Sequence, residues 1–234
     1  MTASIGRAAH AGSLARRALS PAIMAFVVAA LSLLPGSAAA HPHVWVKVQT
    51  QVLHDKAGRI TGLRHAWTFD EFYSAFATQG MDKDGDGTLS QGELEPLAAE
   101  NVSSLQEFDY FTFVKANGND ATHAEPRDYR LDHVDGILTL HFTLPLKTAL
   151  DPLTQKVTFS IYDPTFFVAF DFDKSNPVML ASTAPKSCHP KFAESKTAQV
   201  KLSELGEAFY SSLDATSEFG SQFAKTIAID CGTN

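Results

Sequence analysis

The sequence predicts an α+β fold, mainly an antiparallel β-sandwich with a helix–loop–helix insertion at residues 69–107 and a short C-terminal helix. Residues 44–49 alternate between apolar and other side chains, which is the period of a half-buried strand. The dipeptides Asn117-Gly118 and Asp135-Gly136 each separate two short strand-like runs, as hairpin turns do. Between these β segments, residues 69–107 follow the period of a helix instead.

The first two predicted strands cover residues 44–52 and 59–68. The polar tract 54–58 lies between them and reads as a turn. We therefore expect the two strands to form an antiparallel hairpin.

The insertion begins with Phe69, Phe72, Tyr73 and Phe76, which have the i, i+3, i+4, i+7 spacing of one buried helix face. A second helix is predicted over residues 91–106. Ser90 and Glu93 have the spacing of a capping box at its start. Pro96 would bend this helix or delay its start.

The remaining chain is again strand-like. Strands are expected over residues 110–116, 127–134, 137–144, 157–162, 166–172, 178–182 and 225–231. Leu202, Leu205, Phe209 and Leu213 mark the short amphipathic helix. Residues 41–234 are thus expected to form a single β-rich domain.

Residues 1–40 have the three parts of a secretory signal peptide. Three arginines and no acidic residue occur near the start, an apolar stretch covers residues 18–34, and Ala38-Ala39-Ala40 closes the segment. We expect cleavage after Ala40 and a periplasmic location, by either the general or the twin-arginine export route. A membrane anchor is the alternative, but the apolar stretch is short and interrupted by Pro21. No membrane span is expected after cleavage.

Charge and composition exclude some classes of protein. The chain has 234 residues, 19 basic and 26 acidic, and a formal charge of −7. Removing residues 1–40 takes away three basic residues and no acidic one, which makes the charge −10. Such a chain attracts cations and is not expected to bind nucleic acid.

Cys188 and Cys231 are the two cysteines of the chain. In an exported protein a pair of cysteines most simply forms a disulfide bond. A metal-binding or redox-active thiol pair is the alternative, but the chain has no C-x-x-C motif.

The most specific motif is DKDGDGTLSQGE at residues 82–93, which matches the twelve-residue EF-hand calcium loop. Its carboxylates at positions 1, 3, 5 and 12 are Asp82, Asp84, Asp86 and Glu93, and Thr88 at position 7 would offer its backbone carbonyl. Gly87 permits the sharp turn that brings these oxygens together. Ca²⁺ is therefore the expected ligand, either as a structural ion or as a regulatory one. The alternative is an acidic, glycine-rich surface loop.

A second metal site is predicted at the new N-terminus. Cleavage after Ala40 would leave His41-Pro42-His43, so that an α-amine and two imidazoles lie close together. Imidazole suits Ni²⁺, Co²⁺, Cu²⁺ and Zn²⁺. If the first hairpin pairs tightly, Asp70 or Glu71 could add a carboxylate. An exposed histidine pair without metal is the alternative.

No catalytic motif supports an enzyme. The sequence has no G-x-S-x-G, no P-loop, no dinucleotide-binding fingerprint and no H-E-x-x-H. We therefore assign no catalytic residue and expect the protein not to be an enzyme.

The chain resembles domain-of-unknown-function family 1007 over nearly all of residues 41–231. Besides the loop at 82–93, the resemblance rests on the segments HPHVWV, WTFDEFYSAF, LQEFDYFTFV, LPLKTALDPL, YDPTFFVAF and TIAIDC. It implies an exported bacterial protein belonging to an uncharacterised ABC-type transport system. Family members often occur beside nickel/cobalt-type transporters, which implies a role in metal handling. Solute-binding proteins usually have two larger α/β lobes, and this chain departs from that pattern.

Besides a metalloenzyme with an N-terminal histidine, three functions remain open from the sequence. The first is a calcium-binding accessory of an inner-membrane metal transporter. The second is a transition-metal chaperone or sensor that uses His41 and His43, with calcium purely structural. The third is a calcium-stabilised structural or adhesive module, and the oligomeric state is open in each case.

Overall fold

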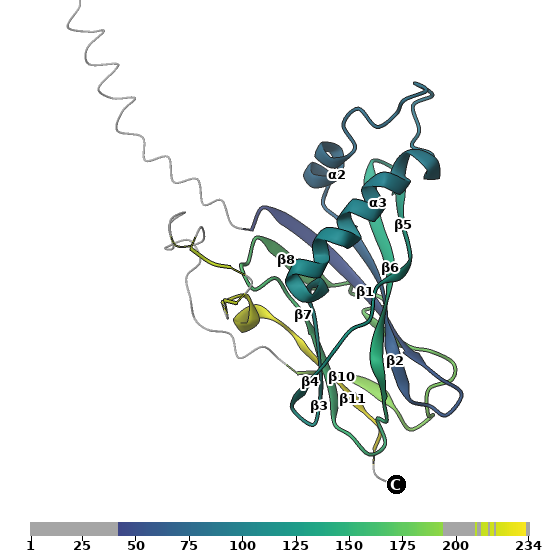
Figure 1. Cartoon of the computed structure of the whole chain (residues 1–234), viewed down its shortest axis with the longest axis vertical. Coiled ribbons are helices and arrows are strands. Elements are labelled where there is room, and N and C mark those ends of the chain that lie inside the picture. The colour runs from purple at the N-terminus through teal and green to yellow at the C-terminus, as the bar shows by residue number, and fades with distance from the viewer. Residues whose placement is uncertain (1–41, 194–208, 210–211, 215, 218, 233–234) are drawn as a thin grey trace, which may run out of the picture. The chain divides into compact units, whose positions relative to one another are not determined.

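The computed structural model describes residues 42–193, 209, 212–214, 216–217 and 219–232, and these form an α+β arrangement of two β-sheets and a few helices (Figure 1). All of them lie in one compact unit of the chain. No helix among the described residues is both long and apolar enough to cross a membrane.

The larger sheet has six strands, in the order β5-β6-β2-β1-β8, and β9 also pairs with β1. Its strands are β1 (Val44–His54), β2 (Ile60–Phe69), β5 (Arg127–Val134), β6 (Ile137–Leu150), β8 (Val168–Phe172) and β9 (Val178–Leu180). The smaller sheet has the order β10-β11-β7-β3-β4. It contains β3 (Thr112–Ala116), β4 (Asn119–Ala121), β7 (Val157–Ile161), β10 (His189–Ala193) and β11 (Thr226–Asp230).

The predicted hairpin of the first two strands is confirmed. β1 and β2 pair antiparallel, with Val48 opposite Trp67. In the connecting turn, the Asp55 carboxylate accepts hydrogen bonds from the backbone N–H groups of Ala57 and Arg59, each at 2.9 Å. The Asp55 side chain therefore stabilises the turn, as Asp side chains often do by accepting hydrogen bonds from the turn backbone.

Both Asx-Gly hairpins are confirmed as well. Asn117 and Gly118 have φ values of 51° and 85°, and Asp135 and Gly136 have 51° and 79°. Two successive positive φ values are typical of a type I′ turn, whose twist matches that of the flanking strands. The turns connect β3 to β4 and β5 to β6.

Not all of the pairing is antiparallel. β8 and β9 both pair with β1 in parallel, β8 along Val44–Val48 and β9 along Thr50–Val52. The turn at Asp163 explains this arrangement, because it takes the chain from β7 in one sheet to β8 in the other. The Asp163 carboxylate is buried and accepts hydrogen bonds from the N–H groups of Thr165 and Val168.

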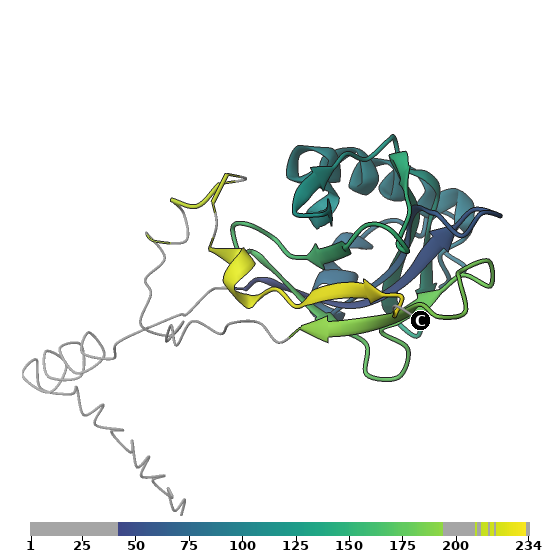
Figure 2. The same ribbon diagram turned by 90° about the horizontal axis from the view of Figure 1, so that it is seen from below.

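The helical insertion contains α2 (Glu71–Ala77), α3 (Gln91–Leu105) and the 3-10 segment η1 (Gln106–Phe111). α3 begins at Gln91 with the predicted capping box between Ser90 and Glu93. Pro96 lies inside α3 and does not delay its start. Figure 2 shows the helices lying on one side of the strands, and α3 packs against β5.

Two expectations about this region were wrong. Phe69 belongs to the end of β2 and not to a helix, and Phe72 and Phe76 on α2 are 87% and 77% exposed. The strand expected from Tyr110 begins only at Thr112, because Asp109, Tyr110 and Phe111 all have positive φ values near 50°. Extended pairing is incompatible with that backbone conformation.

One cluster of buried side chains joins both sheets and α3. It includes Val48, Trp67 and Phe142 from the larger sheet, Phe159 and Ile227 from the smaller one, and Leu94 from α3. The predicted C-terminal strand is present as β11, whereas its partner β10 was not expected. The helix predicted around residues 202–213 lies largely outside the described residues, and a short 3-10 segment, η3 (Gly220–Phe223), precedes β11.

Candidate metal centre

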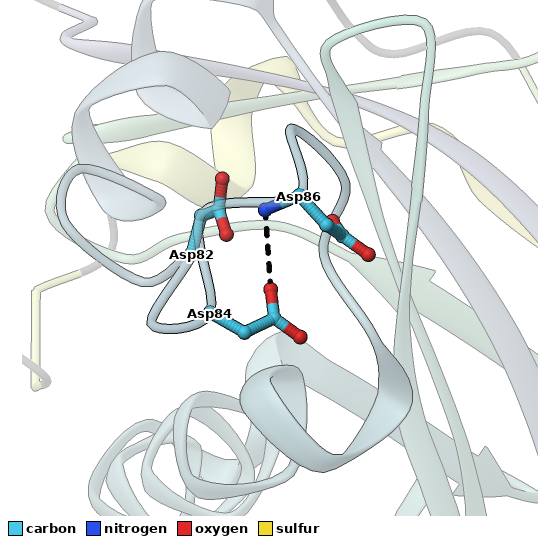
Figure 3. A group of neighbouring side chains, drawn as sticks. All are labelled: Asp82, Asp84 and Asp86. Carbon is cyan, nitrogen blue, oxygen red and sulfur yellow. Dashed lines mark hydrogen bonds between the residues drawn. The ribbon is translucent and has the colours of Figure 1, made fainter.

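The loop between α2 and α3 brings three carboxylates together. Oxygen atoms of Asp82, Asp84 and Asp86 all lie within 4.8 Å of one another (Figure 3). Asp84 and Asp86 are exposed to solvent. Among the described residues, this is the group of His, Cys, Asp and Glu side chains that is spaced to hold a metal ion.

Backbone hydrogen bonds to Asp82 shape the loop. Its Oδ1 accepts the N–H of Gly85 at 2.7 Å, and its Oδ2 accepts the N–H of Gly87 at 3.0 Å. Both glycines have positive φ, 73° and 82°, which other residues adopt only with strain. The glycines therefore allow the chain to fold around the first aspartate.

The two later aspartates are held in the same way. Oδ1 of Asp84 accepts the N–H of Asp86 at 3.3 Å, shown as a dashed line in Figure 3. Oδ1 of Asp86 accepts both the N–H and the hydroxyl of Thr88, each at 2.7 Å. In Asp84 and Asp86, Oδ1 is thus bonded to the loop, and no hydrogen bond from another described residue reaches Oδ2.

Glu93 closes the loop but does not belong to the group of three carboxylates. Its Oε1 accepts the N–H of Lys83 at 2.7 Å, and its Oε2 accepts the N–H and hydroxyl of Ser90 at 2.9 and 2.8 Å. The N–H of Lys83, followed by the Ser90 groups, lowers the pKa of Glu93 to about 2. Its carboxylate is therefore ionised at neutral pH, since these donors stabilise the charged form.

The predicted N-terminal metal site is only partly described. His41 lies outside the described residues. The His43 N–H donates to the carbonyl of Phe167 at 2.9 Å, and the two rings lie 4.7 Å apart. Asp70 does lie next to β1, as the hairpin predicted, but its Oδ2 accepts the N–H of Trp45 and its Oδ1 caps α2 through the N–H of Tyr73.

The predicted disulfide between Cys188 and Cys231 is present. Cys188 directly precedes β10 and Cys231 directly follows β11, and these two strands pair antiparallel. The bond therefore joins the two strands at one end of this pair, next to the partners His189 and Asp230.

One further feature was not expected from the sequence. It is a cavity of about 780 Å³ lined by η1, β3, β4 and the segment after β4. Most of its lining comes from the stretch 106–125, and the rest comes from residues 147, 162, 164, 216 and 217, which are distant in the sequence. Only a set of contacts between strands could have indicated it.

The fold and the loop define an α+β protein with an internal disulfide and a carboxylate-lined candidate metal site. The chain belongs to the family described as "Protein of unknown function (DUF1007)", which matches residues 26–231. It is also 32% identical over 105 residues to the "Uncharacterized 15.5 kDa protein in trpE 3'region" of Spirochaeta aurantia. That match covers 44% of this chain and 74% of the relative.

Proposed function

We propose that this chain is an exported calcium-binding protein, a β-sandwich whose EF-hand loop at residues 82–93 holds the ion. The convergence of Asp82, Asp84 and Asp86 within 4.8 Å carries the proposal. Ca²⁺ prefers six to eight oxygen ligands, several of them carboxylates, and tolerates irregular geometry. The Gly85 and Gly87 turns and the capped start of α3 keep these oxygens on one side of the loop.

Glu93 would complete the ligand set from the first turn of α3. Each oxygen of a carboxylate has two lone pairs, so it can accept one hydrogen bond and still offer a lone pair to a cation. The bonds from Lys83 and Ser90 already hold Glu93 across both ends of the loop. Such preorganisation reduces the entropy that a ligand residue loses when the ion binds.

The wider role proposed here is that of a periplasmic accessory of a nickel/cobalt-type metal transport system. Support comes from the family resemblance, from the export signal expected in residues 1–40 and from the charge of −10 expected after cleavage. A charge of that sign attracts cations to the protein surface.

A transition-metal chaperone that uses His41 and His43 is the competing function, and native mass spectrometry separates the two. Protein recovered from the periplasm should start at His41 and carry calcium. The chaperone would be favoured instead if the protein also carried a transition-metal ion and if His43→Ala removed that ion.

Calcium titration of the chain starting at His41 tests the loop directly. We expect one Ca²⁺ per chain with a Kd of about 10⁻⁴–10⁻³ M, as in other extracellular calcium modules. Glu93→Gln should weaken binding at least about tenfold, because it removes one charge and the bidentate grip. Glutamine keeps a capping box possible, so α3 should still form.

Glu95→Gln is the matched control. It makes the same charge change two residues further along α3, outside the twelve-residue loop. Calcium affinity within about twofold of the unmodified chain is expected there, since an exposed charge acts weakly through solvent. Absence of calcium binding in the unmodified chain, or equal affinity in Glu93→Gln, would refute the loop assignment.

A further inference from the structure

The second feature with the form of a binding site is the cavity of about 780 Å³ at the β3–β4 hairpin. Its other walls come from η1, from residues 122–125, from Lys147 on β6, from the start of the turn after β7 and from residues 216–217. No residue of the loop 82–93 lines it, so it is separate from the proposed calcium site. Its volume lies in the range of pockets that hold small organic molecules.

A strained turn forms one wall of this cavity. Asp109, Tyr110 and Phe111 have consecutive φ values of 49°, 55° and 48°, a left-handed conformation that costs about 1–2 kcal/mol per residue. Packing of the Phe111 ring against Phe108 and Phe170 holds the turn in place. Asp109 and Tyr110 consequently line the cavity, and strain of this kind is often retained where a protein binds a ligand.

The charged groups of the lining leave an excess of carboxylates. Lys115 and Asp120 form an ion pair at 2.5 Å and compensate each other. Asp109 and Glu125 have no ion-pair partner among the described residues, and Lys147 is the remaining cation of the lining. Two unpaired carboxylates against one ammonium make the cavity attractive to positive charge.

The other titratable groups of the lining do not reverse this sign. Burial lowers the pKa of His123, so its ring is neutral at pH 7 and adds no positive charge. Burial, and then the nearby Glu125 and Asp109 charges, raise the pKa of Tyr110, so its hydroxyl stays protonated. The lining also contains Phe113 and Tyr162, whose rings stack with centroids 4.2 Å apart. Aromatic rings attract organic cations through their negative faces.

We propose that this cavity binds a small aliphatic amine, with Asp109 and Glu125 as counter-charges and its aromatic lining in contact with the carbon chain. A bare metal ion fits less well, because the convergent metal-ligand group among the described residues lies in the loop 82–93 and not here. An anion fits less well because Lys147 is outnumbered by the unpaired carboxylates.

Calorimetric titration with spermidine tests the proposal. All proteins carry Asp84→Asn and Asp86→Asn, so that spermidine cannot bind the acidic loop and the result does not depend on the calcium proposal. We expect saturable binding that weakens with salt, because exposed charges are screened. Asp109→Asn and Glu125→Gln should each weaken it about fivefold, the effect of one charge pair near the surface. Lys147→Met should leave it unchanged or tighter.

Asp128→Asn is the matched control, because Asp128 is also exposed, also has a positive φ, at 53°, and does not line this cavity. Asparagine tolerates this conformation, so both Asn variants should fold, which circular dichroism checks. The proposal is overturned if spermidine does not bind saturably, if Asp109→Asn and Glu125→Gln are without effect, or if Asp128→Asn weakens binding equally. Tighter binding of citrate than of spermidine would also overturn it, because the cavity would then prefer anions.

Discussion

His65 is the histidine whose chemistry the fold alters most. It is fully buried on β2, where its Nδ1 lies 3.0 Å from the Thr50 hydroxyl and its Nε2 lies 3.5 Å from the Thr112 hydroxyl. Thr112 belongs to β3, so this contact joins the two sheets. Burial, and to a lesser extent the nearby His123, lower the pKa of His65 from 6.5 to about 3.

Unfolding should therefore become easier in mild acid. Between these two pKa values the unfolded chain binds a proton that the folded chain does not, so stability is lost as pH falls below about 6.5. From pH 7.5 to pH 5 the His65 contribution amounts to about 2 kcal/mol. Urea unfolding at several pH values measures this effect. The free energy of unfolding should change less with pH in His65→Leu than in the unmodified chain.

His133→Gln provides the comparison, because His133 lies on β5 and is not fully buried. It should retain the pH dependence of the unmodified chain. If the free energy of unfolding depended on pH equally in His65→Leu and His133→Gln, His65 would not have the lowered pKa described above. His65 lies on the same face of β2 as Leu63 and Trp67, and alternation along one strand cannot show that another sheet covers that face.

At the scale of elements, α2 is attached through few side chains. Asp70 caps it, and Tyr73 packs on Phe69 with ring centroids 4.6 Å apart. The buried Ser74 hydroxyl donates to the Asp70 carbonyl and accepts the N–H of Leu138 at 3.0 Å. The prediction of one buried aromatic helix face was wrong. Phe69, the first residue of that face, ends strand β2, and the aromatic residues of α2 do not share one buried face.

Replacing the exposed aromatics of α2 should consequently have little effect on stability. Phe72→Ser and Phe76→Ser are expected to change the free energy of unfolding by no more than about 0.5 kcal/mol each, as exposed substitutions usually do. Leu94→Ala on α3 is the contrast, because Leu94 is 1% exposed and its loss should cost about 3 kcal/mol. Chemical denaturation measures all three, and a cost above 1 kcal/mol for Phe72→Ser would mean that its ring is covered in solution.

For the molecule as a whole, the Cys188–Cys231 bond restrains the C-terminal part. It spans 43 residues, and a loop of that length stabilises the folded state by about 4 kcal/mol through the entropy of the unfolded chain. The double variant Cys188→Ala/Cys231→Ala should lose about this much in guanidinium unfolding. Reduction of the unmodified chain by dithiothreitol should reproduce the loss, and an unchanged midpoint in both would contradict a stabilising role.

Local signals in the sequence were enough to predict much of this protein. Alternation and turn chemistry act between near neighbours, and they correctly gave the β1–β2 hairpin, the two Asx-Gly hairpins and the capped start of α3. The positions of the aspartates in the loop 82–93 also follow from local backbone geometry, because Gly85 and Gly87 adopt the positive φ that the pattern requires. The disulfide followed from there being only two cysteines to pair.

Only the tertiary structure decided the features that depend on distant segments. Parallel pairing of β8 and β9 with β1 required the turn at Asp163, where the chain passes from one sheet to the other. The residues of this turn do not predict which sheet the next strand joins. Which elements pack together decides the exposure of Phe72 and Phe76 and the cavity beside Asp109. No short-range sequence pattern predicts this packing. The sequence therefore determined the local hairpins, caps and loop, whereas long-range packing decided which surfaces they bury and which cavities they leave.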